Sequence, residues 1–540
     1  MSNYIGITIG PIIKMMSMTA SPVGLWGTSY FFSYTAKQLC QKLVEKDVPI
    51  ENFLSPYFEV NEEKKIKNRR NGVGLFHDRI IFIEPKNFKF SQVEEIIQSV
   101  KEEIGVNLYK SLGDVGQKFD KEKVKVYIRE MLQIYAVEKE CQSGNPLINI
   151  NDLLDAMELQ MQYVPQENIN YLLALLENKD KEKRNKAIKK SFLVNDFNSD
   201  FEKWPLTKGF DKKIRSIDDI ALGGLKEPKM KKHQYYAVVQ ADGDNMGKIL
   251  KSINVVSDGT NPIRLFSKCC FDYCCQATDV ATEYGAVTIY AGGDDLLLLA
   301  PLENKKKETI FDLLQKLNNV FNESFEDYKK FKPSLSIGMT ACYHKYPLYE
   351  SFEKSINLLF RYAKNTKRKD DVKNALAFHF QKHAGQSFGM KIREVNAEDG
   401  IYLKIIKILK EQWDSIDTQK NFLKSVEHGL YNNQVLFKIA IRKAINEHDD
   451  TLINNLFYNI FDSTIHTEVE IFKTYIHDIR VLMYNLCKEN EQIELFEDML
   501  NQTSENDENV EKVEKIIKCM NMLLRLLKFY SEPGLEEKNE

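Results

Sequence analysis

The sequence lacks a long hydrophobic run. No segment approaches the roughly 20 consecutive apolar residues that a membrane-spanning helix needs. The N-terminus, MSNYIGITIGPIIKMMSM, also lacks the extended apolar core of a signal peptide. We therefore expect no membrane association and a cytoplasmic location.

An excess of charge of either sign is missing too. The chain of 540 residues has 75 Lys and Arg against 78 Asp and Glu, a net charge of -3. The whole chain therefore gives no electrostatic sign of nucleic-acid binding. Two runs, 64–71 and 179–190, are locally basic, and each is either a solvated surface or a nucleic-acid contact.

The nine cysteines form no regular framework. Four of them lie in KCCFDYCC (268–275), which is not a pair of separated CxxC motifs, so a zinc ribbon is not indicated. We expect the cysteines to be small apolar core residues of a protein in a reducing compartment. With only 14 prolines and 43% hydrophobic residues, the chain is typical of a globular protein of several domains.

The hydrophobic pattern predicts an α+β protein. Residues 1–120 alternate strand-like and helix-like stretches: a strand over 4–12, a helix over 25–46, a strand over 72–85 and a helix ending near 113. Residues 121–225 are expected to form a helical domain, with helices over 121–140, 151–164 and 166–178, and then a linker.

A second α/β unit is predicted over 226–390. Its elements follow the order β-α-β-β-α-β, with one more helix and strand appended, as in a ferredoxin-like unit. In that order the first and third strands lie side by side. Residues 391–540 show helical spacing and are expected to form a C-terminal helical bundle.

Three carboxylates stand out in this second unit. Asp242 ends the first predicted strand, and Asp294 and Asp295 follow two glycines at the hairpin between the next two strands. Carboxylates that converge repel one another, and a divalent cation such as Mg²⁺ or Mn²⁺ relieves the repulsion. Two such ions could support phosphoryl transfer. The alternative is a polar hairpin turn, because Gly and Asp both favour turns.

The neighbouring glycines fit a nucleotide site. Gly292 and Gly293 permit a tight hairpin and a close approach of substrate to the backbone. Gly243 and Gly247 flank a strand-to-helix turn, whose free N–H groups can hold phosphate.

These motifs resemble a known family. VVQADGDNMGKIL (238–250), TIYAGGDDLLLLAPL (288–302), SLSIGMT (334–340) and AKNTKRKDDVKNALAF (363–378) are similar to the palm polymerase domain of the Cas-ten family, the large subunits of type III CRISPR effector complexes. ITIGPIIKMMSMTASPVGLWGTSYFFSY (7–34) and NGVGLFHDRIIF (71–82) resemble the first palm domain of its Cmr-type members. The resemblance implies two ferredoxin-like palm domains, an intervening helical domain and a C-terminal bundle.

The resemblance also implies an activity and partners. Family members join guide RNA and other type III subunits, and pairing with target RNA triggers ATP-dependent synthesis of a nucleotide second messenger. A ribose 3'-hydroxyl attacks the α-phosphate of ATP and pyrophosphate leaves. Carried over to this chain, Asp242 and Asp294 would bind metal, with Asp295 as a third ligand or a support for the nucleotide.

Further residues follow from the same resemblance. The backbone of Gly243, Asp244, Asn245, Met246 and Gly247 would hold the triphosphate. Lys364 and Lys373 either neutralise phosphate or are solvated surface lysines.

Many relatives begin with an HD-type nuclease domain, and a palm-like strand from residue 4 leaves no room for one. Of three His-Asp pairs, the one at 77–78 belongs to the palm-like motif GVGLFHDRI, and those at 448–449 and 477–478 lie in the helical C-terminal region without companion histidines. We therefore expect no DNase activity.

The sequence does not decide which product is made or which molecule accepts the AMP group. The product is either a cyclic oligoadenylate or, as in some relatives without the nuclease, a conjugate of S-adenosylmethionine and AMP. In the latter case the first palm would hold the acceptor through Gly10, Ser29 and Asp78. Two other functions compete with synthesis in a complex: a non-enzymatic scaffold and a stand-alone GGDEF-like cyclase.

Overall fold

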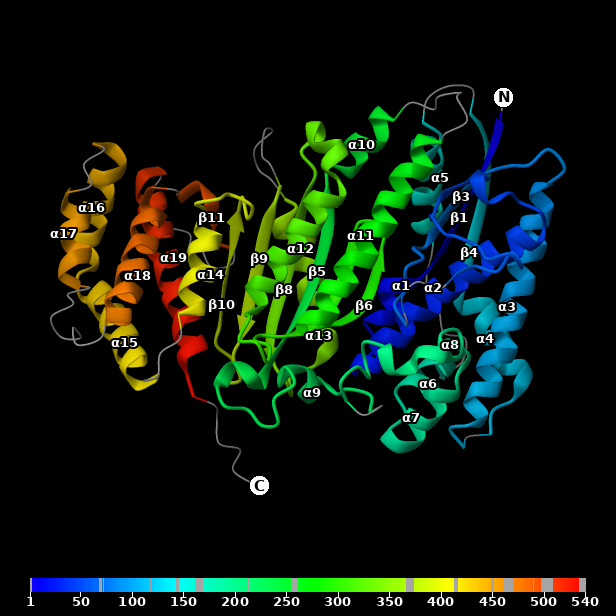
Figure 1. The fold of residues 1–540 in the computed structure, drawn as a ribbon, viewed down its shortest axis with the longest axis horizontal. Helices are drawn as coiled ribbons and strands as arrows, with labels where there is room; N and C mark the ends of the chain where they lie inside the picture. Colours follow the sequence, from blue (N-terminus) through cyan, green and yellow to red (C-terminus); the bar gives the residue numbers. More distant parts are fainter. Residues whose placement is uncertain are drawn as a thin grey trace.

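Two β-sheets follow one another along the molecule, and a group of helices lies at the C-terminal end (Figure 1). The computed structural model describes residues 2–67, 70, 72–116, 118–141, 145–160, 169–210, 213–253, 261–365, 373–411, 416–447, 451–460, 470–488, 490–496 and 508–533. Within these ranges, no helix is both long and apolar enough to cross a membrane.

The first sheet has four antiparallel strands in the order β2-β3-β1-β4. Its strands are β1 (Ser2–Gly10), β2 (Phe53–Ser55), β3 (Arg79–Ile83) and β4 (Gln133–Cys141). Ile5, Ile7 and Ile9 of β1 face a core shared with α2 (Pro22–Glu45) and α3 (Phe90–Gly113). The opposite face of β1 meets α5 (Pro146–Glu158), because a Cβ atom on Gly6 would lie 2.4 Å from Ile150.

Strand β4 corrects the sequence prediction of one helix over 121–140. Helix α4 (Lys121–Met131) ends early, and residues 133–141 pair with β1 along its whole length. Buried Ile134 and Val137 are three residues apart, a spacing that is typical of a helix and therefore misleads the prediction. Pairing with β1 makes this segment a strand, since strand preference depends on context. The first sheet thus extends past the boundary predicted at residue 120.

The second sheet has seven strands in the order β11-β10-β9-β8-β5-β7-β6. They are β5 (Tyr235–Asp244), β6 (Val287–Gly292), β7 (Asp295–Pro301), β8 (Ser334–Tyr343), β9 (Ala375–Gln381), β10 (Ser387–Arg393) and β11 (Ile493–Glu494). The predicted neighbourhood of its first and third strands is confirmed, because β5 pairs with β7. Residues 391–540 are not wholly helical, contrary to the prediction, because β10 ends at Arg393 and β11 lies within this range.

Helices cover both faces of this sheet. Helices α11 (Pro262–Tyr284) and α12 (Ile310–Ser324) share a core with Ile337 and Met339 of β8. Helix α13 (Leu348–Asn357) and the π-helical segment η5 (Leu358–Ala363) lie on the other face, where a Cβ atom on Gly338 would meet the backbone of Leu359 at 2.4 Å.

The remaining helices form two groups. One lies beside the first sheet: α1 (Ile12–Met16), α6 (Tyr171–Leu176), α7 (Lys181–Lys190) and α8 (Phe192–Asn195). Helix α9 (Ile217–Ala221) instead contacts β5 and β7 of the second sheet. The other group lies at the C-terminal end: α14 (Ile401–Lys410), α15 (Ile416–Asn432), α16 (Gln434–Asn446), α17 (Thr451–Ile460), α18 (Glu470–Lys488) and α19 (Glu508–Ser531).

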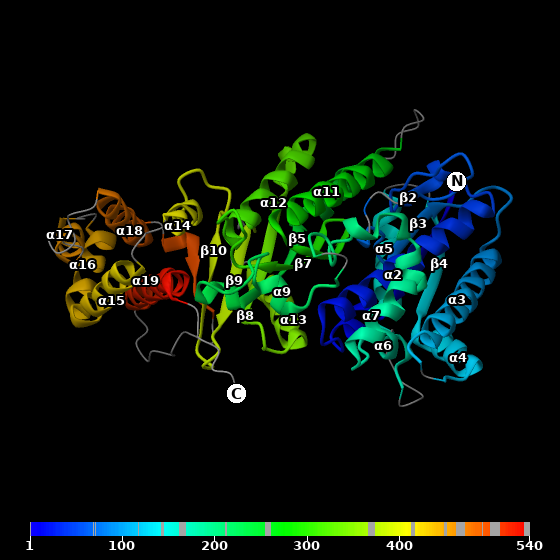
Figure 2. The same ribbon diagram turned by 60° about the horizontal axis from the view of Figure 1, so that its bottom comes forward.

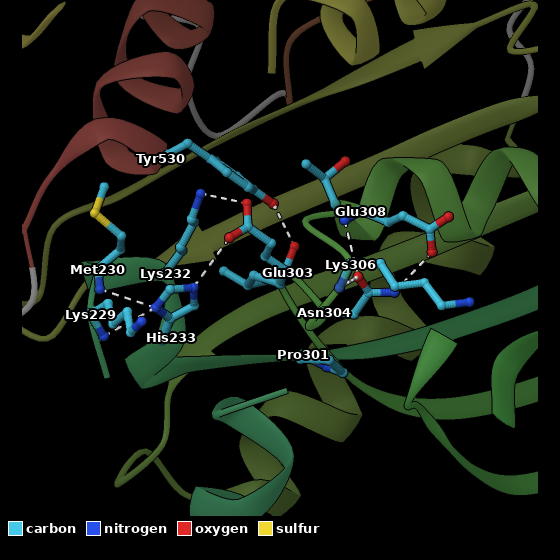
Figure 3. Close-up of polar contacts among 12 residues, drawn as sticks. Lys229, Met230, Lys232, His233, Pro301, Glu303, Asn304, Lys306, Glu308 and Tyr530 are labelled. Carbon is cyan, nitrogen blue, oxygen red and sulfur yellow. Dashed lines mark hydrogen bonds and ion pairs between the residues drawn. The ribbon is translucent and has the colours of Figure 1, made fainter. Parts of the chain in front are cut away.

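A buried polar network of His233, Lys232 and Glu303 lies between α19 and the second sheet (Figure 3). His233 Nδ1 accepts the N–H groups of Lys229 and Met230 at 3.2 and 3.0 Å. Its Nε2–H therefore donates to Glu303 at 3.2 Å, and the Lys232 ammonium binds the second Glu303 oxygen at 2.5 Å. Burial alone would raise the pKa of Glu303, but His233 and Lys232 lower it. Tyr530 of α19 lies beside this network, its ring 5.5 Å from the Lys232 ammonium.

Candidate active site

The three predicted carboxylates converge at neighbouring strand ends. Asp242 lies near the end of β5, one position beyond the last β5–β7 pair, Ala241 and Leu296. Asp295 opens β7, and Asp294 precedes it in the turn. The carboxylate of Asp294 packs on the β5 backbone, since a Cβ atom on Gly243 would lie 2.8 Å from its Oδ2. A larger residue at 243 would require the side chains of Asp294 and Met246 to shift.

Burial and mutual repulsion disfavour charge on the hairpin acids. Burial, and then the negative charge of Asp242, raise the pKa of Asp294 to about 7. Burial and the charge of Asp294 raise the pKa of Asp295 well above its usual range. The Asp295 residue is exposed, and it lines two cavities. A bound cation would therefore stabilise the ionised forms of Asp294 and Asp295.

Lys364 supplies one positive charge to this cluster. It follows η5, forms an ion pair with Asp242 and donates to the Gly243 carbonyl at 2.8 Å. Its ammonium is also 3.9 Å from Asp244 Oδ1. The role of Lys364 and Lys373 in binding phosphate stays a prediction. Lys373 is half-buried, in the segment that leads into β9.

Asp244 points away from the cavities. Its side chain is fully buried, and its Oδ2 accepts hydrogen bonds from Ser334 Oγ, Ser336 Oγ and the N–H of Asn374, at 2.8, 2.7 and 3.0 Å. Burial raises the pKa of Asp244, and Lys364 and the three donors oppose the increase. Asp244 thus joins β5, β8 and the segment before β9 in one polar cluster.

The turn after Asp244 is tight. Asn245 adopts a left-handed conformation with φ of 63°, and its side chain donates to the Lys332 carbonyl at 2.9 Å. Met246 begins the seven-residue helix α10 (Met246–Ser252), while Gly247 is exposed. Phosphate binding by this turn stays a prediction.

A cavity of about 390 Å³ adjoins the acids. Both sheets and α11 contribute to its walls, which contain Gly292, Gly293, Asp294 and Asp295. The first sheet and its loops add Leu54, Ser55, Pro56, Tyr57, Leu75, His77, Asp78, Arg79 and Ile81. α5, α10, α11 and β6 supply Leu147, Asn151, Leu250, Ile263, Phe266, Ser267, Cys270, Phe271 and Tyr290.

A second cavity of about 190 Å³ lies on the other side of Asp295. It shares Asp78, Tyr290 and Asp295 with the larger one and also contains Ser29. Two of the three acceptor residues predicted in the first unit, Ser29 and Asp78, thus line it. The third, Gly10, lines neither of these two cavities.

The cations of the larger cavity are already neutralised. Arg79 donates to Glu158 at 2.8 and 2.7 Å and to Asp155 at 2.5 Å. Burial and the charge of Arg79 lower the pKa of His77 to about 4, so the ring is neutral at pH 7. Burial and Glu158 raise the pKa of Asp78 to about 6. The cavity is therefore acidic.

Sequence reasoning missed one contact at the hairpin. The Cys274 thiol, on α11, donates to the Gly293 carbonyl at 3.3 Å. The thiol stays protonated, because burial and neighbouring acidic groups raise its pKa well above the usual range. All nine cysteines are free, and most are buried, as the sequence predicts. No sequence pattern distinguishes Cys274 from its neighbours.

The His-Asp pairs occupy unrelated positions. His77 Nε2 lies 2.9 Å from Ser55 Oγ at the large cavity. His477 is on the surface of α18, 3.1 Å from Arg480. The pair at 448–449 lies outside the described residues. The absence of DNase activity stays a prediction.

The donor set fits a hard divalent cation, which prefers oxygen ligands. Among the residues that the structure describes, no group of three or more His, Cys, Asp or Glu side chains is arranged to hold a metal by itself. Substrate phosphates and water would have to complete the coordination of an ion at Asp242, Asp294 and Asp295.

Two family models match the chain. Residues 4–110 match the N-terminal domain of the CRISPR-associated protein Cmr2, and residues 235–373 match the second palm domain of Cas10/Cmr2. The Cmr2 subunit of the CRISPR Cmr system of Pyrococcus furiosus is 27% identical over 188 residues, which are 30% of this chain and 20% of that subunit. The aligned region is thus about a fifth of the length of the relative.

One solved structure shares the fold, and a second aligns less closely. A chain of the type III-B Cmr-beta complex in its apo state aligns with a TM-score of 0.55 and 11% identity, over 97% of this chain and 81% of that chain. A chain of the Csm1–Csm4 cassette in complex with cA4 aligns with a TM-score of 0.46 and 11% identity, over 97% of this chain and 70% of that chain.

Proposed function

Because this chain belongs to the Cas10/Cmr2 family, we propose that it is the nucleotide-synthesising subunit of a type III CRISPR effector complex. In this proposal it assembles with guide RNA and other subunits, and target RNA triggers synthesis of a second messenger from ATP. The observation that carries the proposal is the convergence of Asp242, Asp294 and Asp295 beside a cavity built by both sheets.

The side chains have distinct tasks in this reaction. Asp242, Asp294 and Asp295 would hold Mg²⁺ or Mn²⁺, which neutralises charge on the reacting phosphate. Gly292 and Gly293 leave the turn backbone open to the nucleotide. The chain positions a ribose 3'-hydroxyl against the α-phosphate of ATP, and no side chain has to act as a covalent nucleophile.

Lys364 would change partners during the reaction. Its ammonium pairs with Asp242 here, and a divalent cation at Asp242 would repel it. The side chain would then be free to bind the outgoing pyrophosphate, in keeping with the role that the sequence motif predicts.

The electrostatics of the cavity favour one of the two products. Asp294 and Asp295 would be occupied by the metal, so the acid that remains in the cavity is Asp78, which is mostly ionised at pH 7 because its pKa is about 6. His77 is neutral, and Arg79 is already paired. A second ATP, with several negative charges, meets repulsion there. S-adenosylmethionine carries a sulfonium and an ammonium group, so an acidic cavity suits it better as the acceptor.

The test uses the assembled complex with matching target RNA, Mg²⁺ or Mn²⁺ and labelled ATP, with and without S-adenosylmethionine. Mass spectrometry identifies the products. We expect a conjugate that appears only with S-adenosylmethionine; a cyclic oligoadenylate formed from ATP alone would contradict the electrostatic argument.

A matched pair of variants tests the site. Asp294→Ala with Asp295→Ala should abolish synthesis, while Glu398→Ala with Asp399→Ala removes two adjacent exposed acids and should leave it unchanged. No product from the wild-type complex would favour a non-enzymatic scaffold. Synthesis by the isolated chain without target RNA would favour a stand-alone cyclase.

A further inference from the structure

Helix α7 presents a surface of lysines, which we call the α7 lysine face. Segment 179–190 contains seven basic and two acidic residues, within a chain whose net charge is -3. Only Ala187 and Ile188 of the helix are buried. The face consists of the exposed Lys179, Lys181, Lys183, Lys186, Lys189 and Lys190.

Half of these lysines have no acidic partner. Lys183 pairs with Asp180 at 3.3 Å and Lys190 with Asp114 at 3.5 Å. In the part of the chain that the structure describes, the other four lysines of the face have no carboxylate within 4 Å, although Lys181 is near enough to Asp218 to help lower the pKa of that carboxyl group. Like charges three and four positions apart destabilise a helix. The face therefore costs stability, which a bound polyanion would recover.

The helical spacing concentrates the charge. Lys186 lies opposite the buried stripe, with Lys183, Lys189 and Lys190 three or four positions away on the same side. Neighbouring positions of this kind are about 5–6 Å apart. The lysines can therefore contact successive phosphates of one strand.

The composition of the face favours nucleic acid over protein. Protein interfaces are depleted in lysine and rich in aromatic and apolar anchors, whereas nucleic-acid interfaces are much more positively charged. An aromatic group also accompanies the lysines: the half-buried Phe201, whose ring lies 5.6 Å from the Lys189 ammonium. An aromatic ring beside lysines suits single-stranded RNA, whose bases can stack on it.

We propose that the α7 lysine face binds the phosphate backbone of single-stranded RNA. This surface is separate from the candidate active site. In Figure 1, α7 lies with α6 and α8 near the bottom of the view, whereas α10, the helix that follows β5, lies near the top. Figure 2 again shows α7 next to α6, beside the first unit. The proposal concerns binding alone and holds whether or not the chain synthesises a nucleotide. Of the other basic run, residues 68, 69 and 71 lie outside the described residues.

The test measures binding of a labelled oligouridylate to the full-length chain across a salt series. Lys186→Gln with Lys189→Gln removes two unpaired charges, and Lys86→Gln with Lys424→Gln removes two exposed charges elsewhere. Each lost phosphate contact lowers the slope of log K against log salt by about 0.7. We expect the α7 pair to lower the slope by about 1.4 and to weaken binding about twentyfold at 0.1 M salt.

Three results would overturn the proposal: equal affinity for the two variant pairs, an unchanged salt slope in the α7 pair, or equally tight binding of a polyglutamate peptide of the same charge. The last result would assign the face to an acidic protein. Misfolding does not imitate the expected result, since a uniform loss of active protein leaves the salt slope unchanged.

Discussion

Replacing Asp294 with asparagine should stabilise the metal-free protein at alkaline pH. Burial and Asp242 raise the pKa of Asp294 from 3.8 to about 7. A carboxyl group with a raised folded-state pKa contributes stability that is present below the unfolded pKa. That stability is lost as the pH rises through the folded pKa. Asparagine stays neutral throughout, so the advantage of the variant should grow between pH 5 and pH 8.

The magnitude follows from the shift. About three pKa units correspond to about 4 kcal/mol, and water in the cavity screens part of this, so we expect about 2 kcal/mol at pH 8. Hydrogen exchange of the β5 and β7 amides measures the local free energy of opening. The protein should contain no divalent cation, and Asp399→Asn, at an exposed site, serves as the control.

A divalent cation should reverse the order. Mn²⁺ binds the ionised carboxylate, so it should stabilise the wild type more at pH 8 than at pH 6 and have little effect on Asp294→Asn. A lower stability of Asp294→Asn than of the wild type, without metal at pH 8, would contradict the raised pKa of Asp294. A stability difference between the two proteins that does not change with pH would contradict it equally.

Three further substitutions test contacts around the site and the C-terminal helix. Asp244→Ala leaves three buried donors without an acceptor and should cost about 3–5 kcal/mol in chemical denaturation, whereas Asp244→Asn keeps an acceptor and should cost less than about 2 kcal/mol; equal costs would contradict the assignment. Cys274→Ala removes the donor to Gly293 and should speed hydrogen exchange in the turn by about fivefold, and Cys274→Ser should restore the wild-type rate. Lys232→Met removes the ammonium partner of the buried Glu303, which keeps only its contact with His233 among the network described above, and should cost about 3 kcal/mol. A second change, Glu303→Leu, should recover most of this cost; no recovery would show that the ion pair is not the cause.

The convergence of the acids could be predicted because it depends on the order of elements. Alternating hydrophobic segments predict the β-α-β-β-α-β order, which makes the first and third strands neighbours. Asp242 and Asp294 then need only lie near the ends of those strands. Their distance along the chain, 52 residues, is irrelevant once the order is known.

The role of Asp244 could not be read in the same way. It belongs to the same motif as Asp242 and lies two positions further along the same strand. The difference comes from the neighbouring strand, where the register places Ser334 opposite Asp244 and Ser336 opposite Asp242. A one-residue change of register would move both serines to the other face of the sheet. Register between distant strands is not encoded in either motif.

The walls of the cavities depend on contacts between the two units. The two sheets meet where Ala291 donates to the Gly74 carbonyl at 3.1 Å, next to the bridge between Gly74 and Tyr290. Tyr290 lines both cavities and precedes the acidic turn by only a few residues. A small displacement of the first unit would therefore change the space beside Asp295 without moving β5 or β7. Access to the acids therefore depends on the position of the first unit, because the acids belong to one sheet and the walls that face them belong to both.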